Sequence, residues 1–181
     1  MEQSFLYLKG IISDKLYYHK LDIRVSPTED IILDSWPGSF IRNNFLFAAS
    51  QIKTKKGTTL FEVIATIPIN NTNCLFQELS GGFPKCFSIY FPENVYAERY
   101  QKLQKDEIFS FSICIFGKMS EYYIDFIEAI KLMCKRGMGK PISPLQLIDI
   151  CESHPHNRPS LLTSGTEGTI KALKHPISIM N

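Results

Sequence analysis

The sequence has no long apolar segment and no excess of charge of either sign. Its 181 residues carry 20 Lys and Arg against 18 Asp and Glu, which gives a formal net charge of +2. No uninterrupted apolar run approaches the roughly 20 residues of a membrane-spanning helix, and the first residues lack the basic character of a secretory signal. We therefore predict a cytoplasmic protein with no membrane partner, and expect any surface for a polyanion to be a local patch.

Paired cysteines and the common cofactor motifs are also missing. The five cysteines form no Cys-x-x-Cys pair; they are Cys74, Cys86, Cys114, Cys134 and Cys151. Three of them fall in predicted apolar elements, where a reduced cysteine packs as a small hydrophobic residue, so neither a disulfide nor a metal framework is expected. The sequence has no phosphate-binding P-loop, no dinucleotide fingerprint and no Ser-His-Asp signature. We predict no cofactor and no metal site.

The sequence does contain one complete strand–helix–strand unit at residues 107–150. Residues 108–116 alternate between an apolar face and a face of small polar residues, which predicts a strand. The apolar face consists of Phe109, Phe111, Ile113 and Ile115. Gly117 ends this strand, and a second apolar run at residues 145–150 predicts the closing strand of the unit.

The helix of this unit is predicted to begin after Ser120, a good N-cap residue. Its apolar stripe recurs at spacings of three and four residues and consists of Tyr123, Phe126, Ile127, Ile130, Met133 and Cys134. Its opposite, solvent face consists of Glu121, Asp125, Glu128 and Lys131. Lys135 and Arg136 suit the negative end of the helix dipole, and Gly137 can take the positive φ of a helix C-terminus.

The first part of the chain predicts a similar unit. Strands are expected at residues 5–12, 16–25 and 31–33, and a helix at residues 40–52 with Ser39 as its cap. Two more short apolar runs follow this helix. They predict strands at residues 60–69 and 86–92.

This order of elements predicts an α+β fold. Strand, helix, strand, strand, helix and strand make a ferredoxin-like antiparallel sheet with both helices on one face. We assign this domain to residues 1–151, with an insertion-like middle region at residues 53–105. Pro and Gly interrupt residues 152–181, where we expect a tail or linker, or the start of a truncated second domain.

Two short motifs resemble a known family. The order Ile115-Phe116-Gly117, Tyr122-Tyr123 and Gly137-Met138-Gly139-Lys140 is similar to that of the CRISPR-associated RNA-processing endoribonucleases of the repeat-associated mysterious protein (RAMP) superfamily. The segment from Gly38 to Asn43 is similar to that family's Gly-Ser-x-x-Arg-Gly, with Asn43 in place of the last glycine. The resemblance covers roughly residues 35–151 and implies an N-terminal RAMP-type domain. It also implies CRISPR repeat RNA as the partner, together with other CRISPR-associated proteins or a second domain.

The glycine turn after the second helix is the first candidate site. The resemblance implies that its backbone amides and cations meet RNA phosphates; the residues are Lys135, Arg136, Gly137, Gly139 and Lys140. The alternative is an ordinary helix C-terminus with basic residues matched to the dipole.

A second basic cluster flanks the first predicted helix. It consists of Arg42 at one end and Lys53, Lys55 and Lys56 at the other. These cations also suit an RNA backbone. The alternative is an ordinary solvated loop.

His19 is the one candidate catalytic residue. Together with Tyr17, Tyr18 and Lys20 it supplies the residue types for cleavage of RNA by its own 2′-hydroxyl, in which side chains move protons and a cation stabilises the developing charge. The Asp and Glu residues are dispersed, whereas a two-metal nuclease needs clustered carboxylates. Any cleavage is therefore expected to be metal-independent.

Three classes of function remain open from the sequence. The first is binding, with or without processing, of CRISPR repeat RNA, to which the glycine turn and its cations point. The second is a non-catalytic scaffold or protein-interaction domain of the same superfamily, which the short length favours. The third is an unrelated ferredoxin-like domain that binds a small ligand or a partner.

Overall fold

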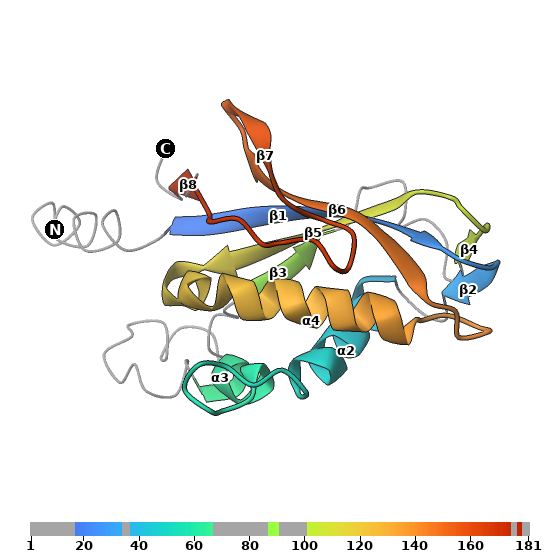
Figure 1. The fold of residues 1–181 in the computed structure, drawn as a ribbon, viewed down its shortest axis with the longest axis horizontal. Coiled ribbons are helices and arrows are strands. Elements are labelled where there is room, and N and C mark those ends of the chain that lie inside the picture. The colour runs from blue at the N-terminus through green and yellow to red at the C-terminus, as the bar shows by residue number, and fades with distance from the viewer. Residues whose placement is uncertain (1–16, 34–36, 67–86, 91–100, 175–176, 179–181) are drawn as a thin grey trace, which may run out of the picture.

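A computed structural model describes residues 17–33, 37–66, 87–90, 101–174 and 177–178 of the chain. Five strands form one antiparallel sheet in the order β3-β5-β1-β6-β7, and the short β8 pairs with the start of β1 (Figure 1). The strands of this sheet are β1 (Tyr17–Pro27), β3 (Phe87–Tyr90), β5 (Phe109–Phe116), β6 (Leu145–His154), β7 (Asn157–Ser164) and β8 (Ile177–Ser178). The predicted strand at residues 5–12 lies outside the described residues.

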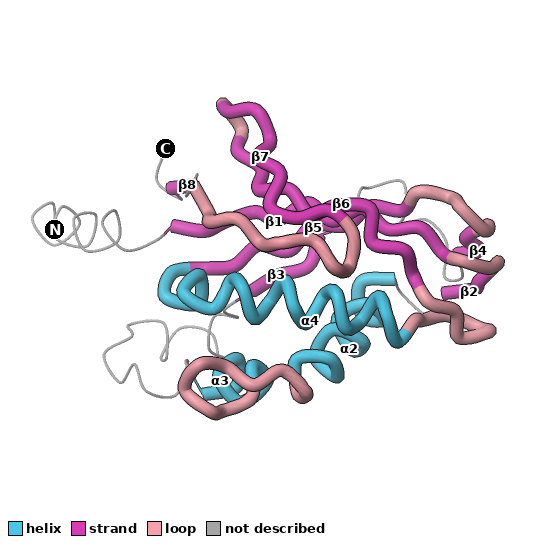
Figure 2. Tube along the Cα trace, viewed as in Figure 1, coloured by secondary structure: helices cyan, strands magenta, loops and turns pink. Residues whose placement is uncertain are grey.

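The helices cover one face of this sheet. Figures 1 and 2 show α2 (Pro37–Ala49), α3 (Leu60–Thr66) and α4 (Tyr123–Arg136) on the same side of the strands. Along the chain the order β1, α2, β3, β5, α4, β6 places the strands side by side as β3-β5-β1-β6. This is the ferredoxin-like arrangement, so the predicted α+β class and topology are confirmed. Among the described residues, no helix is long and apolar enough to cross a membrane.

The core lies between the sheet and the helices. Alternation in β1 places Leu21, Ile23 and Val25 in this core, all but completely buried. The helices are joined to the sheet by three aromatic rings: the Phe45 centroid lies 5.3 Å from that of Phe87 and 5.4 Å from that of Phe126. Each of α2, β3 and α4 contributes one ring. The cluster therefore fixes the two long helices against the β3 side of the sheet.

A second, two-stranded sheet lies at the end of the molecule where the β1–β2 turn is found. β2 (Ile31–Leu33) pairs with β4 (Gln101–Leu103), and Ile32 also exchanges backbone hydrogen bonds with Lys140, at 3.0 and 2.9 Å. The loop that follows α4 is thereby fixed to β2. β2 agrees with the sequence-based prediction, whereas β4 lies in the predicted insertion-like middle region, outside the strands predicted there.

One predicted strand is a helix. The sequence pattern of residues 60–69 predicts an extended segment, but Leu60–Thr66 forms α3. The reason lies just before it: Thr59 Oγ1 accepts a hydrogen bond from Glu62 N at 3.2 Å, and Glu62 Oε2 accepts one from Thr59 N at 2.7 Å. This is a capping box. The Thr-x-x-Glu spacing is visible in the sequence and outweighs the β-branched residues that suggest a strand.

The predicted tail is wrong where the structure describes it. β6 continues past Ile150 to His154 and turns into β7, the last strand on that side of the sheet. Pro159 and the lack of alternation in β7 conceal the strand in the sequence, but an edge strand tolerates proline because only one of its sides is paired. In addition, β3 lies within residues 53–105 and belongs to the main sheet, so the prediction that this whole region is an insertion is wrong.

Two expected helix caps and one expected solvent-exposed residue are also corrected. α2 begins at Pro37, which places Ser39 inside its first turn. Residues 117–122 form a 3₁₀ helix in which the Ser120 hydroxyl donates to the Gly117 carbonyl, so Ser120 does not cap α4. Lys131, assigned to the solvent face of α4, is buried because residues 165–174 lie over that face.

Candidate nucleic-acid interface

The three lysines at residues 53–56 lie on a small, hydrogen-bonded hairpin. Thr54 N donates to the Thr58 carbonyl and Gly57 N to the Thr54 carbonyl, both at 2.9 Å, which closes the turn. Lys53, Lys55 and Lys56 are exposed on it. We call residues 53–59 the lysine hairpin. Its cations are held on an ordered backbone rather than on an irregular loop.

The lysine hairpin packs against the beginning of α4. Lys56 Nζ lies 5.5 Å from the centroid of the Tyr122 ring, and its hydrogen bond to Tyr122 raises the pKa of Lys56. Burial raises the pKa of Asp125, and the nearby charge of Lys55 opposes that shift. These contacts place the hairpin beside the first turn of α4, far from it in the sequence.

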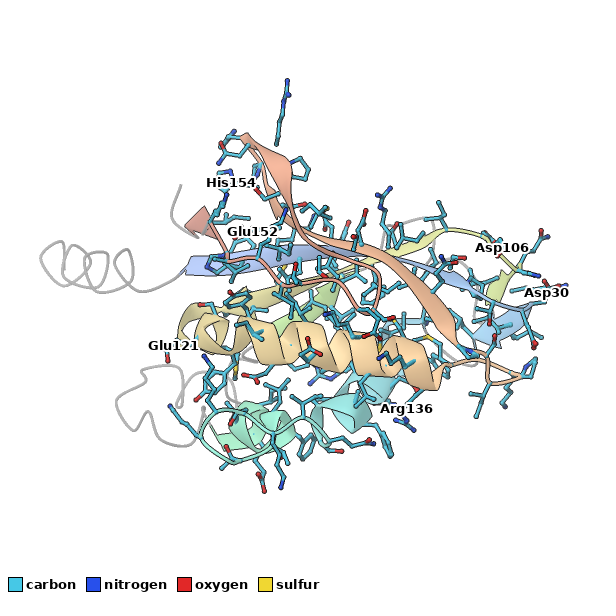
Figure 3. All side chains as sticks on the ribbon, viewed as in Figure 1. Asp30, Asp106, Glu121, Arg136, Glu152 and His154 are labelled. Carbon is cyan, nitrogen blue, oxygen red and sulfur yellow. The ribbon has the colours of Figure 1, made fainter. Side chains whose placement is uncertain are left out.

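The last turn of α4 carries two more of the cations predicted to bind RNA, Lys135 and Arg136. The Arg136 guanidinium lies 3.7 Å from the centroid of the Phe47 ring, which is 52% exposed. Lys135 Nζ lies 2.6 Å from Glu167 Oε1, and this hydrogen bond lowers the pKa of Glu167. Figure 3 shows Arg136 at one end of α4 and Glu121 just before the other end.

Five of the predicted RNA-binding residues thus share the helical side of the molecule: Lys53, Lys55, Lys56, Lys135 and Arg136. Arg42 is half-buried on α2, with its guanidinium 4.8 Å from the centroid of the Phe87 ring. Lys140 is exposed in the loop bound to β2. The hairpin lysines and the pair Lys135 and Arg136 therefore share the helical side of the molecule but lie at opposite ends of α4.

The glycine turn has a different role from the expected one. Gly137 and Gly139 are both buried and both have positive φ, at 80° and 92°. The amides of Gly137, Met138 and Lys140 donate to backbone carbonyls of the protein itself. Those three amides are therefore not available to an RNA phosphate, and RNA binding by the cations of the turn stays a prediction. The turn instead joins α4 to β2 and β6.

His19 lies on the core side of β1 and is 7% exposed. Its Nδ1 donates to Glu152 Oε1 at 2.7 Å, and the other oxygen of this fully buried carboxylate accepts from Lys174 N at 2.6 Å. Lys20 points to the opposite face of the strand, where it pairs with Asp22 at 3.4 Å. The structure thus separates His19 from the lysine expected to act with it.

Sequence reasoning missed Glu152 as the partner of His19. The sequence contains one indication of this role, which is the position of Glu152. Residues 150 and 152 share a face of β6, so Glu152 lies on the core face of that strand. A carboxylate on such a face needs hydrogen-bond donors. The expected tail hides this signal, because it ends β6 before Glu152.

The face of the sheet opposite the described helices carries a polar network. Asp22 accepts hydrogen bonds from Ser112 at 2.6 Å and from Ser153, so it joins β5, β1 and β6. Arg24 Nε donates to Asp149 Oδ1 at 2.8 Å, and this pairing lowers the pKa of Asp149. The network explains the polar face of β5 that the sequence shows. Among the described residues, no three His, Cys, Asp or Glu side chains are grouped as ligands for a metal ion.

The fold and this surface define a ferredoxin-like α+β domain whose sheet is covered by helices on one face, with a basic hairpin on the helical side. The chain belongs to the AF_1859_N family: the model for that family, described as an N-terminal domain, matches residues 16–175. No curated protein sequence matches the chain.

Among the 16 chains of solved structures that match this chain are two from CRISPR-Cas complexes. One is a chain of the Csm3–Csm4 subcomplex of the type III-A CRISPR-Cas interference complex, with 13% identity, coverage of 76% of this chain and 79% of that chain, and a TM-score of 0.48. The other is a chain of the type III-B Cmr-β complex bound to cognate target RNA, with 16% identity, coverage of 82% and 65%, and a TM-score of 0.35. About a third of the second chain therefore has no counterpart here.

Proposed function

We propose that this domain binds CRISPR repeat RNA as part of a CRISPR-associated ribonucleoprotein in the cytoplasm. The observation that carries the proposal is the placement of the lysine hairpin beside α4, which puts Lys53, Lys55 and Lys56 on the same side as Lys135 and Arg136. Cations along one side of a domain suit the backbone of a single strand, whose phosphates release counterions on binding. The RAMP-like motifs in the sequence supply the CRISPR context.

The charge of this surface sets the expected affinity. Acidic residues lie among the cations, including Asp125 near Lys55 and Glu167 beside Lys135. The surface is therefore mixed rather than strongly positive, and binding by the domain alone should be weak and sensitive to salt. Arg136 adds a second kind of contact, because a guanidinium stacked on a ring can receive a base on its free side.

Neutralising the hairpin should weaken RNA binding. The double variant Lys53→Gln/Lys55→Gln removes two exposed cations and should lower the affinity for repeat RNA by roughly 10-fold at moderate salt. The slope of log affinity against log salt should fall by about 1.4, because each phosphate of a single strand that the protein no longer neutralises lowers it by about 0.7. The measurement is fluorescence anisotropy with labelled repeat RNA over a salt series.

The matched control is Lys102→Gln/Lys105→Gln, which removes two exposed lysines from the β4 end of the molecule. This control should change neither affinity nor slope appreciably. Equal losses of affinity in the two double variants would mean that only net charge matters. A wild-type domain that shows no preference for repeat RNA over unrelated RNA, at low salt as well as moderate salt, would refute the proposed function.

A second candidate, a scaffold that binds without cutting, is favoured by the burial of His19. A general acid or base must reach the proton that it moves, and this ring is covered and hydrogen-bonded to Glu152. We expect the isolated chain to cleave no repeat RNA, with Mg²⁺ or with excess EDTA. Cleavage in EDTA that falls about 10²-fold in His19→Ala, at unchanged affinity, would instead establish a metal-independent endoribonuclease.

A further inference from the structure

A groove of about 680 Å³ runs between α4 and the segment that follows β7. Its apolar lining comes from three parts of the chain and consists of Ile52, Ile124, Leu132 and Ile170. This volume lies within the range of sites that hold small molecules. Ile52 directly precedes the lysine hairpin, so one wall of the groove adjoins the surface proposed to bind RNA.

Two lysines one helical turn apart supply the groove's positive charge. Lys131 is buried, and its Nζ donates to the Gly168 carbonyl at 2.8 Å and to Glu128 Oε1 at 3.2 Å. Lys135 is half-exposed, and its partner in an ion pair is Glu167, which is 84% exposed. Lys131 thus holds the segment to the helix, whereas the Lys135–Glu167 pair lies open to solvent.

The segment opposite α4 is held at both ends. Gly165 N donates to the Ile148 carbonyl at 3.1 Å, and Lys171 N donates to the Leu162 carbonyl at 2.9 Å. Lys131 adds the contact at Gly168 between these ends. The groove is therefore formed before any ligand arrives, which lowers the entropic cost of binding.

We propose that this groove receives one nucleotide of single-stranded RNA, with the base between the apolar walls and a phosphate on Lys135 in place of the Glu167 carboxylate. The proposal rests on the proposed RNA-binding function and deepens it. A phosphate and a carboxylate accept hydrogen bonds from an ammonium in the same way. An exposed ion pair contributes little to stability, so Glu167 can be displaced at small cost.

The first test removes the competing carboxylate. Glu167→Gln should bind repeat RNA about 2- to 5-fold more tightly, the range that an exposed charge pair allows. The matched control is Glu29→Gln, which removes one exposed acid from the β1–β2 turn and should leave affinity unchanged. An unchanged affinity in Glu167→Gln, or an equal gain in both variants, would overturn the exchange at Lys135.

The second test fills the groove. Ile124→Trp places a large ring against the apolar walls and should weaken binding by about 5- to 10-fold, the low end of one base contact. The matched control is Ile142→Trp in the loop bound to β2, where Ile142 is 76% exposed. Thermal denaturation of both variants checks that they fold.

Crosslinking separates failure of the groove from failure of the function. With 4-thiouridine-labelled repeat RNA, we expect crosslinked peptides from residues 123–136 and 165–171. Normal binding by folded Ile124→Trp, with crosslinks only at the lysine hairpin, would overturn the groove and leave the proposed function standing. A wild-type protein without any preference for repeat RNA over unrelated RNA would contradict both the groove and the proposed function.

Discussion

Replacing Gly137 with alanine should lower the free energy of unfolding by about 3–4 kcal/mol. Gly137 ends α4 with φ of 80°, where a side chain costs about 1–2 kcal/mol. The remainder comes from a collision: a Cβ at this position would lie 2.4 Å from the Ser143 carbonyl oxygen and 2.7 Å from Pro144 N. Both atoms belong to the backbone, so no side chain can move aside to relieve the contact.

Gly57 provides the matched control for this substitution. Its φ is 83°, almost the same, but a Cβ there would meet nothing within 4 Å. Gly57→Ala should therefore cost only about 1 kcal/mol, the conformational part alone. Urea denaturation of both variants measures the difference. Equal losses of stability would show that the backbone of residues 143–144 yields to the new methyl group.

An added Cβ would also collide with its surroundings at Gly139, the second glycine of the turn. A Cβ at Gly139 would lie 2.7 Å from Cβ of Ile31, which is buried. In the sequence, Gly139 belongs to a glycine turn that is expected to meet RNA phosphates. The structure leads us to expect a loss of stability instead.

Replacing Glu152 with alanine should cost about 3–5 kcal/mol, because it removes a fully buried side chain together with the hydrogen bonds that its carboxylate accepts. Glu152 is fully buried and accepts hydrogen bonds from His19 Nδ1 and Lys174 N. Its removal leaves the His19 and Lys174 donors without this acceptor and opens a cavity between β1 and β6. Urea denaturation of the variant at neutral pH measures the loss.

Two further variants show whether burial causes this loss. Glu29→Ala, which removes an exposed acid, should change stability by less than about 0.5 kcal/mol. The double variant His19→Leu/Glu152→Leu should recover part of the loss, because apolar groups that replace both partners leave fewer unsatisfied atoms. If Glu152→Ala were as stable as Glu29→Ala, water would have to reach His19 and replace the hydrogen bonds of the lost carboxylate, and burial would not be the cause.

The main elements follow from local patterns in the sequence. Residues 109–115 alternate, and the stripe from Tyr123 to Cys134 recurs at helical spacing, so β5 and α4 are predicted correctly apart from the start of the helix. The apolar face of each element packs into the core between the sheet and the helices. Under that condition the periodicity of apolar residues is enough to predict the element.

Elements held by partners distant in the sequence escape such prediction. β4 has three residues and exists because β2 lies beside it, and β7 contains a proline and depends on β6. In both strands, hydrogen bonds to another strand stabilise a sequence whose own pattern is weak. α3 is different, because its capping box is present in the sequence and points to the helix without any distant partner.

The sequence by itself determined the class of fold, the end of α4 at a glycine and the presence of two basic clusters. The tertiary structure decided which cations share a surface, because the packing of the lysine hairpin on the beginning of α4 joins residues about 70 positions apart. It also decided that the glycine turn is structural and that His19 is buried with Glu152. The physical reason is that periodicity reports which face of an element is buried, whereas the partner on that face depends on how distant segments pack.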